Sequence, residues 1–201
     1  MDAKKRTMGA SERDEQARTE WKEQVKQFDP KRMVFVDECG SSVSLAPIYA
    51  RAPRGARALG SAPRNWGRNI TLIASMSALG MGEAMTVEGA TDTVAFELYI
   101  ERLLAPSLGR GQVVVMDNLS AHKSERDRHL IAARGCQLLY LPAYSPDLNP
   151  IEQAFSKLKG MLRQARARTK ETLELAISEA LSAVTASDAL GWFRNSGYPA
   201  Q

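Results

Sequence analysis

Three carboxylates stand where a metal-dependent enzyme would need them. Asp37 ends the apolar run R-M-V-F-V-D, Asp117 ends the run Q-V-V-V-M-D, and Glu152 follows the turn S-P-D-L-N-P. Hard cations such as Mg²⁺ and Mn²⁺ bind oxygen ligands of this kind and keep water and substrate phosphates in their remaining positions. Two such ions held among three acids would polarise a phosphodiester, activate a water or hydroxyl, and stabilise the leaving oxygen.

Each acid also has a purely structural explanation. An aspartate at the end of a strand is often only a turn former. If Asn149 caps the helix that follows and Pro150 is its first residue, Glu152 occupies the third helical position. A carboxylate there reaches back to the N–H of the cap and favours the helix dipole. Capping could therefore account for Glu152 without any chemistry.

Other ionisable side chains fit the site less well. Glu38 points to the opposite face of its strand from Asp37, so at most one of the two can serve the site. Asp147 lies in the Pro-flanked turn, where turn chemistry explains it. Cys39 and Cys136 are the only cysteines and lie far apart with no C-x-x-C pairing, which argues against a disulfide framework and a zinc site. An oxygen-ligand site is the simplest prediction.

The elements that must position the acids follow from the apolar periodicity. The pattern predicts strands at about 32–38, 69–78, 81–88, 112–118 and 136–141, and helices at about 11–28, 91–106, 124–134, 150–166, 169–184 and 187–194. Asp37 and Asp117 would then end two strands, and Glu152 would open a helix. A Gly-containing turn near Gly80 predicts a hairpin, and the later strand–helix–strand order predicts parallel pairing. The acids would thus meet at one edge of a sheet.

Basic residues without acidic neighbours suggest contact with phosphate. The segment from 51 to 68 has no acidic residue and five arginines: Arg51, Arg54, Arg57, Arg64 and Arg68. We expect an exposed loop that binds nucleic-acid phosphates, because a merely solvated loop normally carries both signs. Lys157 and Lys159 lie on the helix that begins near Glu152; they are further candidates for nucleic-acid binding, although a solvated helix face explains them equally well.

Length and composition favour one globular domain. The chain has 201 residues, 44% apolar residues and a net charge of +4, which suits a single core. It has no run of 18 apolar residues and no apolar stretch behind its basic N-terminus, so we expect neither a membrane span nor a secretory signal. We divide the chain into an N-terminal helical linker (1–30) and a catalytic domain (31–201), in a cytoplasmic protein.

Three blocks of sequence resemble a known family. V-F-V-D-E, V-V-V-M-D-N-L-S-A-H-K and L-P-A-Y-S-P-D-L-N-P-I-E-Q-A-F-S-K-L-K are similar to the catalytic blocks of bacterial insertion-sequence transposases in the Tc/mariner superfamily. The interval of 35 positions from Asp117 to Glu152 (152 minus 117) is close to that of the family. The resemblance spans about residues 30–197. It implies that Asp37, Asp117 and Glu152 are the catalytic, metal-binding acids, with Asn118 and His122 beside the site.

The resemblance also implies a fold, an activity and partners. The fold would be α/β and RNase H-like, with a mixed sheet of three antiparallel then two parallel strands flanked by helices. The activity would be hydrolysis of phosphodiester bonds at the ends of a mobile element followed by strand transfer, with two Mg²⁺ or Mn²⁺ ions. Double-stranded DNA would be the substrate, and the enzyme would act at the nucleoid, where two copies could form a homodimer.

Family members carry helix-turn-helix domains ahead of the catalytic blocks, and about 30 residues precede them here. A separate helix-turn-helix polypeptide would then recognise the ends, as in a second reading frame or a truncated copy. Two other functions stay open: a DNA-binding remnant that regulates a full-length transposase, and a structure-selective nuclease of the same fold.

Overall fold

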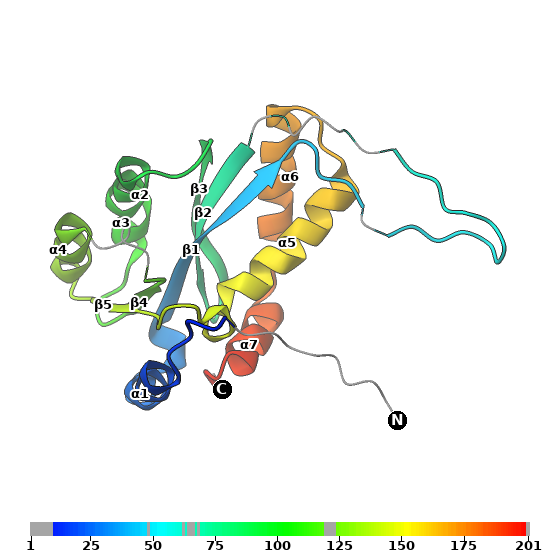
Figure 1. Ribbon diagram of the computed structural model, residues 1–201. Helices are drawn as coiled ribbons and strands as arrows, with labels where there is room; N and C mark the ends of the chain where they lie inside the picture. The colour runs from blue at the N-terminus through cyan, green and yellow to red at the C-terminus, as the bar shows by residue number, and fades with distance from the viewer. Residues whose placement is uncertain are drawn as a thin grey trace, which may run out of the picture.

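A five-stranded sheet separates two layers of helices in the computed structural model of this chain (Figure 1). The structure describes residues 10–47, 49–61, 63, 67, 69–118 and 124–199. Its strands are β1 (Met33–Ser42), β2 (Asn69–Ser77), β3 (Gly80–Glu88), β4 (Val113–Met116) and β5 (Gln137–Tyr140). Its α-helices are α1 (Glu15–Val25), α2 (Thr93–Tyr99), α3 (Ala105–Ser107), α4 (Glu125–Ala133), α5 (Ile151–Ala165), α6 (Lys170–Ser182) and α7 (Ala186–Asn195). The short helices are η1 (Pro30–Arg32), the π-helix η2 (Ile100–Leu104) and η4 (Pro146–Leu148).

The predicted mixed sheet is confirmed. Its strand order is β3-β2-β1-β4-β5. The first three strands pair antiparallel, and β4 and β5 add parallel to β1. The β2–β3 hairpin turns at Gly80, whose φ of 126° is in the region that favours glycine.

The prediction that Asp37 ends its strand is wrong. β1 continues through Ser42, because its antiparallel pairing with β2 extends to Ser42 opposite Asn69. Only the parallel pairing with β4 stops early, at Val36 opposite Met116. Asp37 therefore lies in the middle of β1, at the point where one neighbouring strand ends. Asp117 does directly follow its strand, as predicted.

Each face of the sheet has its own apolar core, because successive side chains of a strand point to opposite faces. Met33, Phe35 and Cys39 of β1 join the core beneath α1, α5, α6 and α7. Val34 and Val36 join the core beneath α2, η2, α3 and α4. Figure 1 shows these two helical layers on either side of the strands.

Several helix ends differ from the predictions. The cap of α1 is Asp14, which accepts the N–H of Ala17, so the helix begins later than the predicted residue 11. The crossover helix is capped by Asp92, and Pro106 lies inside its last turn, α3.

The start of α5 also differs from the prediction. Its cap is Pro150, which makes no side-chain capping bond, in place of the predicted Asn149. The Asn149 side chain instead donates a hydrogen bond to Asp37.

The helix α1 packs onto the sheet layer that carries α5. Its Trp21 and Val25 are buried in that core. Among the described residues, no helix is long and apolar enough to cross a bilayer. The division at residue 30 remains a prediction.

Candidate active site

The register of the central strands brings the first two acids together. β1 and β4 pair with Phe35 opposite Val115 and Val36 opposite Met116. One further step in this parallel register places Asp37 beside Asp117. Odd-numbered residues of both strands, such as Phe35 and Val115, face the α5 layer. Asp37 and Asp117 share that parity and so emerge on the face covered by α5.

The third acid arrives from α5 itself. The apolar stripe of this helix lies on the sheet and includes Ile151, Phe155 and Leu158, all buried in the core. This packing sets the first turn of α5 above the point where β4 ends. Asp37, Asp117 and Glu152 consequently line one cavity of about 370 Å³, whose other walls are Asn118, Leu141, Pro142, Ala143, Tyr144, Ser145, Pro146 and Asn149.

Two hydrogen bonds orient the carboxylate of Asp37. Its carboxylate accepts the backbone N–H of Glu38 at 2.7 Å on Oδ1 and the Asn149 amide at 2.8 Å on Oδ2. Burial raises the pKa of Asp37 to about 7; the Glu38 hydrogen bond opposes this, and the negative charges of Glu152 and Asp117 add to it. The unliganded site thus disfavours three ionised carboxylates at neutral pH.

Glu152 stands exposed at the mouth of the cavity. Loss of solvent around its carboxylate raises its pKa; the nearby Lys159 ammonium opposes this, and Asp117 reinforces it. The capping explanation for Glu152 is wrong, because the cap residue Pro150 has no N–H to donate. The Asn149 N–H donates to the Pro146 carbonyl at 3.0 Å.

The donor set suits a hard divalent cation. Carboxylates that raise one another's pKa are stabilised by an ion between them, and their oxygens are the ligands that Mg²⁺ and Mn²⁺ prefer. Within the described part of the chain, no three acidic, histidine or cysteine side chains converge closely enough to enclose an ion unaided. An open site of this kind leaves positions for water and phosphate.

The two predicted basic residues of α5 have different surroundings. Lys159 lies beside Glu152, Ser156 and Arg163 along a shallow groove of about 190 Å³. Lys157 points to α7, where its Nζ contacts Asp188 Oδ2 at 2.7 Å and the Ala183 carbonyl at 2.9 Å. Only Lys159 adjoins the acids.

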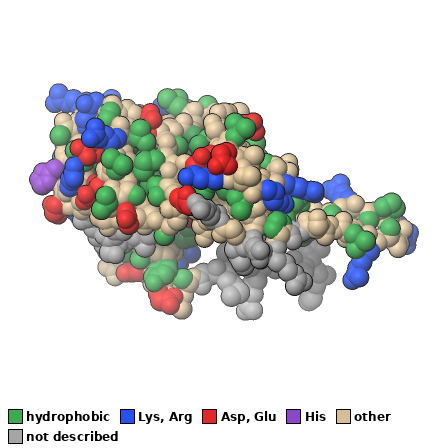
Figure 2. Space-filling view, turned by 90° about the horizontal axis from the view of Figure 1, so that it is seen from above, with side chains coloured by type: hydrophobic (Ala, Val, Ile, Leu, Met, Phe, Trp, Pro, Cys, Tyr) green, Lys and Arg blue, Asp and Glu red, His purple; other side chains and the backbone are tan. Residues whose placement is uncertain are grey.

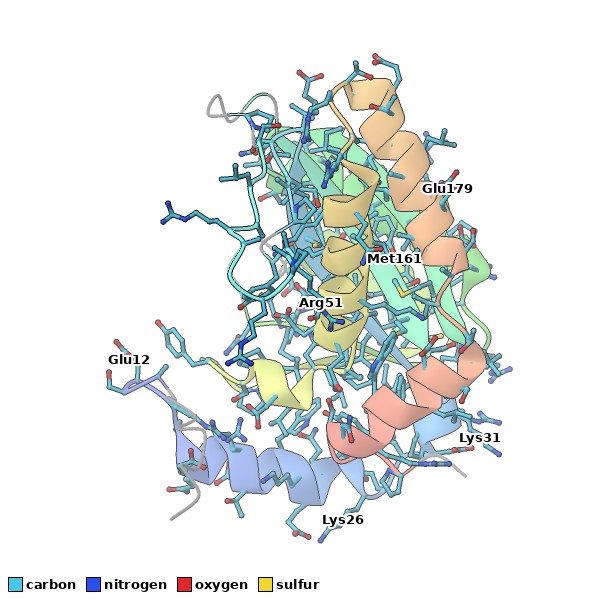
Figure 3. All side chains as sticks on the ribbon, turned by 90° about the vertical axis from the view of Figure 1, so that its right-hand side faces the viewer. Glu12, Lys26, Lys31, Arg51, Met161 and Glu179 are labelled. Carbon is cyan, nitrogen blue, oxygen red and sulfur yellow. The ribbon has the colours of Figure 1, made fainter. Side chains whose placement is uncertain are left out.

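The basic segment projects away from the sheet as a long loop between β1 and β2 (Figure 1). Arg51, Arg54 and Arg57 are exposed on it. Figure 2 shows Lys and Arg side chains along this projection, and Figure 3 shows Arg51 on the side of the sheet that α5 covers. Arg64 and Arg68 lie outside the described residues, as does His122, while Asn118 lines the cavity.

Asn149 and Tyr144 line the cavity, although the sequence did not predict either as a site residue. Asn149 was assigned to helix capping, and only the folded chain shows its bond to Asp37. Tyr144 lines the cavity with a φ of 55°, a backbone conformation that non-glycine residues rarely adopt. Tyr144 stands two residues before Pro146 in a polar turn, and nothing in that local pattern indicates a residue of the site. Glu38 does not line the cavity, in agreement with its predicted opposite orientation.

Comparison with known proteins finds transposases that are similar in sequence to this chain. The chain is 28% identical over 167 residues to the Tcb1 transposase of Caenorhabditis briggsae, and 30% identical over 108 residues to the Tc1 transposase of Caenorhabditis elegans. These matches cover 75% and 52% of this chain. The chain spans 60% and 40% of the length of these relatives.

Solved structures share the fold. The Mos1 transposase in a paired-end complex with the left transposon end superposes with a TM-score of 0.74 at 17% identity, covering 99% of this chain and 64% of that one. The catalytic domain of the Mos1 mariner transposase superposes with a TM-score of 0.62 at 16% identity, covering 92% and 85%. The sheet and its helices are therefore RNase H-like.

The family model for DDE superfamily endonucleases matches residues 32–174, a segment that contains Asp37, Asp117 and Glu152. This match spans the sheet and the first part of α6. The chain belongs to the DDE superfamily endonucleases.

Proposed function

We propose that this chain hydrolyses phosphodiester bonds in double-stranded DNA and transfers the freed strand, as the catalytic domain of a cut-and-paste transposase. The observation that carries the proposal is the convergence of Asp37, Asp117 and Glu152 from β1, β4 and α5 on one open cavity. Turn formation would explain each aspartate alone, but it does not require all three acids to share a cavity.

The acids are proposed to hold Mg²⁺ or Mn²⁺, and two ions fit the chemistry of strand cleavage. Mos1 paired-end complexes with Mn and with Mg support the choice of metal. Bound ions would polarise the phosphate and stabilise the attacking and leaving oxygens. The chain's own contribution is to keep Asp37 oriented by two hydrogen bonds and to supply oxygen ligands from three directions.

Basic residues are proposed to guide the DNA backbone to the acids. Lys159 and Arg163 line the groove that continues from Glu152 along α5. The projecting loop adds Arg51, Arg54 and Arg57, whose exposed guanidinium groups offer charge without a fixed register. We therefore expect contacts with phosphates more than with bases.

We also propose that partners of this chain recognise the element ends. A separate or additional helix-turn-helix polypeptide would supply it, and two copies of this domain would handle two ends. The proposed location is the cytoplasm, at the nucleoid.

Metal binding and cleavage test the proposal together. Mn²⁺ would be titrated into the wild type, Asp117→Asn and Glu38→Gln, and each protein would then be given DNA that carries candidate element ends. Asp117→Asn should lose Mn²⁺ affinity and cleavage, whereas Glu38→Gln should retain both because it lies on the opposite face. Equal affinity in all three proteins would remove Asp117 from the site. Cleavage of branched DNA without strand transfer would favour a structure-selective nuclease, and Mn²⁺ binding without any cleavage would favour a regulatory remnant.

The loop has its own test. Replacing Arg51, Arg54 and Arg57 by Ala should weaken binding equally for all DNA sequences and flatten the slope of log affinity against log salt by about three. Replacing the exposed Lys22, Lys26 and Lys31 by Ala is the charge-matched control and should leave the slope nearly unchanged. An unchanged slope in the arginine variant would show that the loop is only solvated.

A further inference from the structure

The turn that precedes α5 is fixed by the N-terminal helix. Arg18 of α1 reaches Asp147 of η4 with two hydrogen bonds, at 3.0 Å from Nη1 and 2.6 Å from Nη2. The Arg18 side chain is only 3% exposed. Arginine is rarely buried without a partner, and Asp147 is the partner here. Figures 1 and 3 show α1 lying along the end of the sheet beside this turn. Asp147 therefore fixes α1 to the turn, and it does not line the cavity.

The C-terminal segment fixes the same turn from a second direction. The Tyr198 hydroxyl donates to the Leu148 carbonyl at 2.7 Å and accepts the Trp21 Nε1–H at 2.9 Å. Both bonds are buried. Leu148 thus receives a contact from Tyr198, which is itself held by α1, and the neighbouring Asp147 is held by Arg18.

Asn149 is the residue that this turn presents to the acids. It is 3% exposed, and its Nδ2 donates to Asp37 Oδ2 at 2.8 Å. Its Oδ1 is buried with no hydrogen-bond partner among the described residues. The amide does not cap α5 either. Its one side-chain hydrogen bond therefore serves the orientation of Asp37.

We propose that Asn149 is a positioning residue for Asp37, and that Arg18, Asp147 and Tyr198 brace the turn that carries it. This inference rests on the proposed function, because it assigns a purpose to the orientation of a metal-binding acid. A neutral amide restricts the rotation of the carboxylate before the metal arrives, and it adds no positive charge that would compete with the metal. Groups that orient a metal ligand in this way typically change metal affinity by about 10-fold to 100-fold when they are removed.

A merely structural role makes a different prediction. If the brace served only to attach α1, any weakening of that attachment would have the same effect as loss of Arg18. Val25 offers a matched control. It is buried on α1, and its apolar side chain makes no hydrogen bond to the turn. Val25→Ala should loosen α1 by lost packing and leave the turn intact.

The experiment measures Mn²⁺ affinity by calorimetry and by the electron paramagnetic resonance of free Mn²⁺, well below the unfolding midpoint of each protein. The variants are Asn149→Ala, Arg18→Met, their combination, and Val25→Ala. Asn149→Ala should weaken Mn²⁺ binding by about 10-fold or more. Arg18→Met should weaken it less. The double variant should be no weaker than Asn149→Ala, because both changes act through one contact. Val25→Ala should bind Mn²⁺ like the wild type.

Each outcome decides between the proposals. Wild-type Mn²⁺ binding that does not depend on Asp117 would overturn the proposed function itself. Asp117-dependent binding that is unchanged in Asn149→Ala would overturn only the positioning role. Equal losses of Mn²⁺ affinity in Arg18→Met and Val25→Ala would show that the Arg18 contacts only attach α1 to the turn. If Asn149→Ala does not fold, Arg18→Met carries the test, since it changes no residue that lines the cavity.

Discussion

At the scale of single residues, the site depends on how each carboxylate is held. Asp37 is buried and fixed by two hydrogen bonds, whereas Glu152 is exposed and stands near Lys159. A buried acid beside two others has a raised pKa, and a divalent cation reverses that preference by favouring the ionised form. The two acids therefore respond differently to substitution and to pH.

Glu152→Gln should separate chemistry from stability. The change removes the charge that a divalent cation needs and leaves the apolar stripe of α5 intact. We expect metal-dependent cleavage to fall by orders of magnitude, while the free energy of unfolding changes by no more than about 1 kcal/mol, because the lost helix-dipole interaction is offset by relief from the negative charge of Asp117. Urea unfolding and a cleavage assay on the same preparations measure both. A variant that cuts DNA like the wild type would show that Glu152 is not the third acid.

Asp37 should make the metal-free protein less stable as the pH rises. Its folded pKa is about 7 and its ordinary value is 3.8, so the folded state holds a proton that the unfolded chain releases between these values. Stability is greatest below the ordinary pKa and is lost as pH rises through the folded pKa, by up to about 4 kcal/mol. Urea unfolding in chelator at pH 4 to 8 should show this loss in the wild type relative to Asp37→Asn. Parallel curves for the two proteins would contradict it.

At the scale of elements, α5 joins the acidic site to a basic surface. Its buried stripe fixes the rotation of the helix on the sheet, and this rotation decides which lysine adjoins Glu152. Lys159 falls on the side of the groove, and Lys157 falls on the side of α7.

The two lysines form a matched pair for a DNA-binding test. Lys159→Ala should weaken DNA binding and lower the salt slope by about one, with little effect on stability. Lys157→Ala should instead lower stability, because it removes the contacts with Asp188 and the Ala183 carbonyl. Fluorescence anisotropy with labelled duplex and urea unfolding distinguish the two effects. Equal loss of DNA binding in both variants would mean that position on α5 does not matter.

At the scale of the whole molecule, both ends of the described chain meet the central sheet. Phe35 of β1 packs against Phe193 of α7 and Tyr198, with ring centroids 5.3 and 5.0 Å apart. Trp21 of α1 belongs to the same core. The described residues of α1 and of the C-terminal segment therefore share a core with the central strands.

This shared core predicts that α1 and the sheet unfold together. Phe193→Ala should lower the free energy of unfolding by about 3 to 5 kcal/mol, because it leaves a cavity at the centre of the aromatic cluster. Circular dichroism and tryptophan fluorescence should report a single coincident transition. Two separate transitions would show that α1 unfolds independently of the sheet.

The sequence by itself determined the order of elements and predicted the acids of the site. The apolar runs before Asp37 and Asp117 and the helical stripe after Glu152 are local patterns, and local patterns predict strands and helices. The resemblance of the three blocks to one family then predicted that the acids act as a set.

Only the tertiary structure decided which side chains meet. The extension of β1 to Ser42 depends on pairing with β2, a partner that is distant in sequence. The role of Asn149 and the separation of Lys157 from Lys159 depend on the docking of α5 onto the sheet. The contact between Arg18 and Asp147 joins residues 129 positions apart. Such contacts arise from the packing of apolar faces, and a periodic pattern identifies a face without identifying its partner.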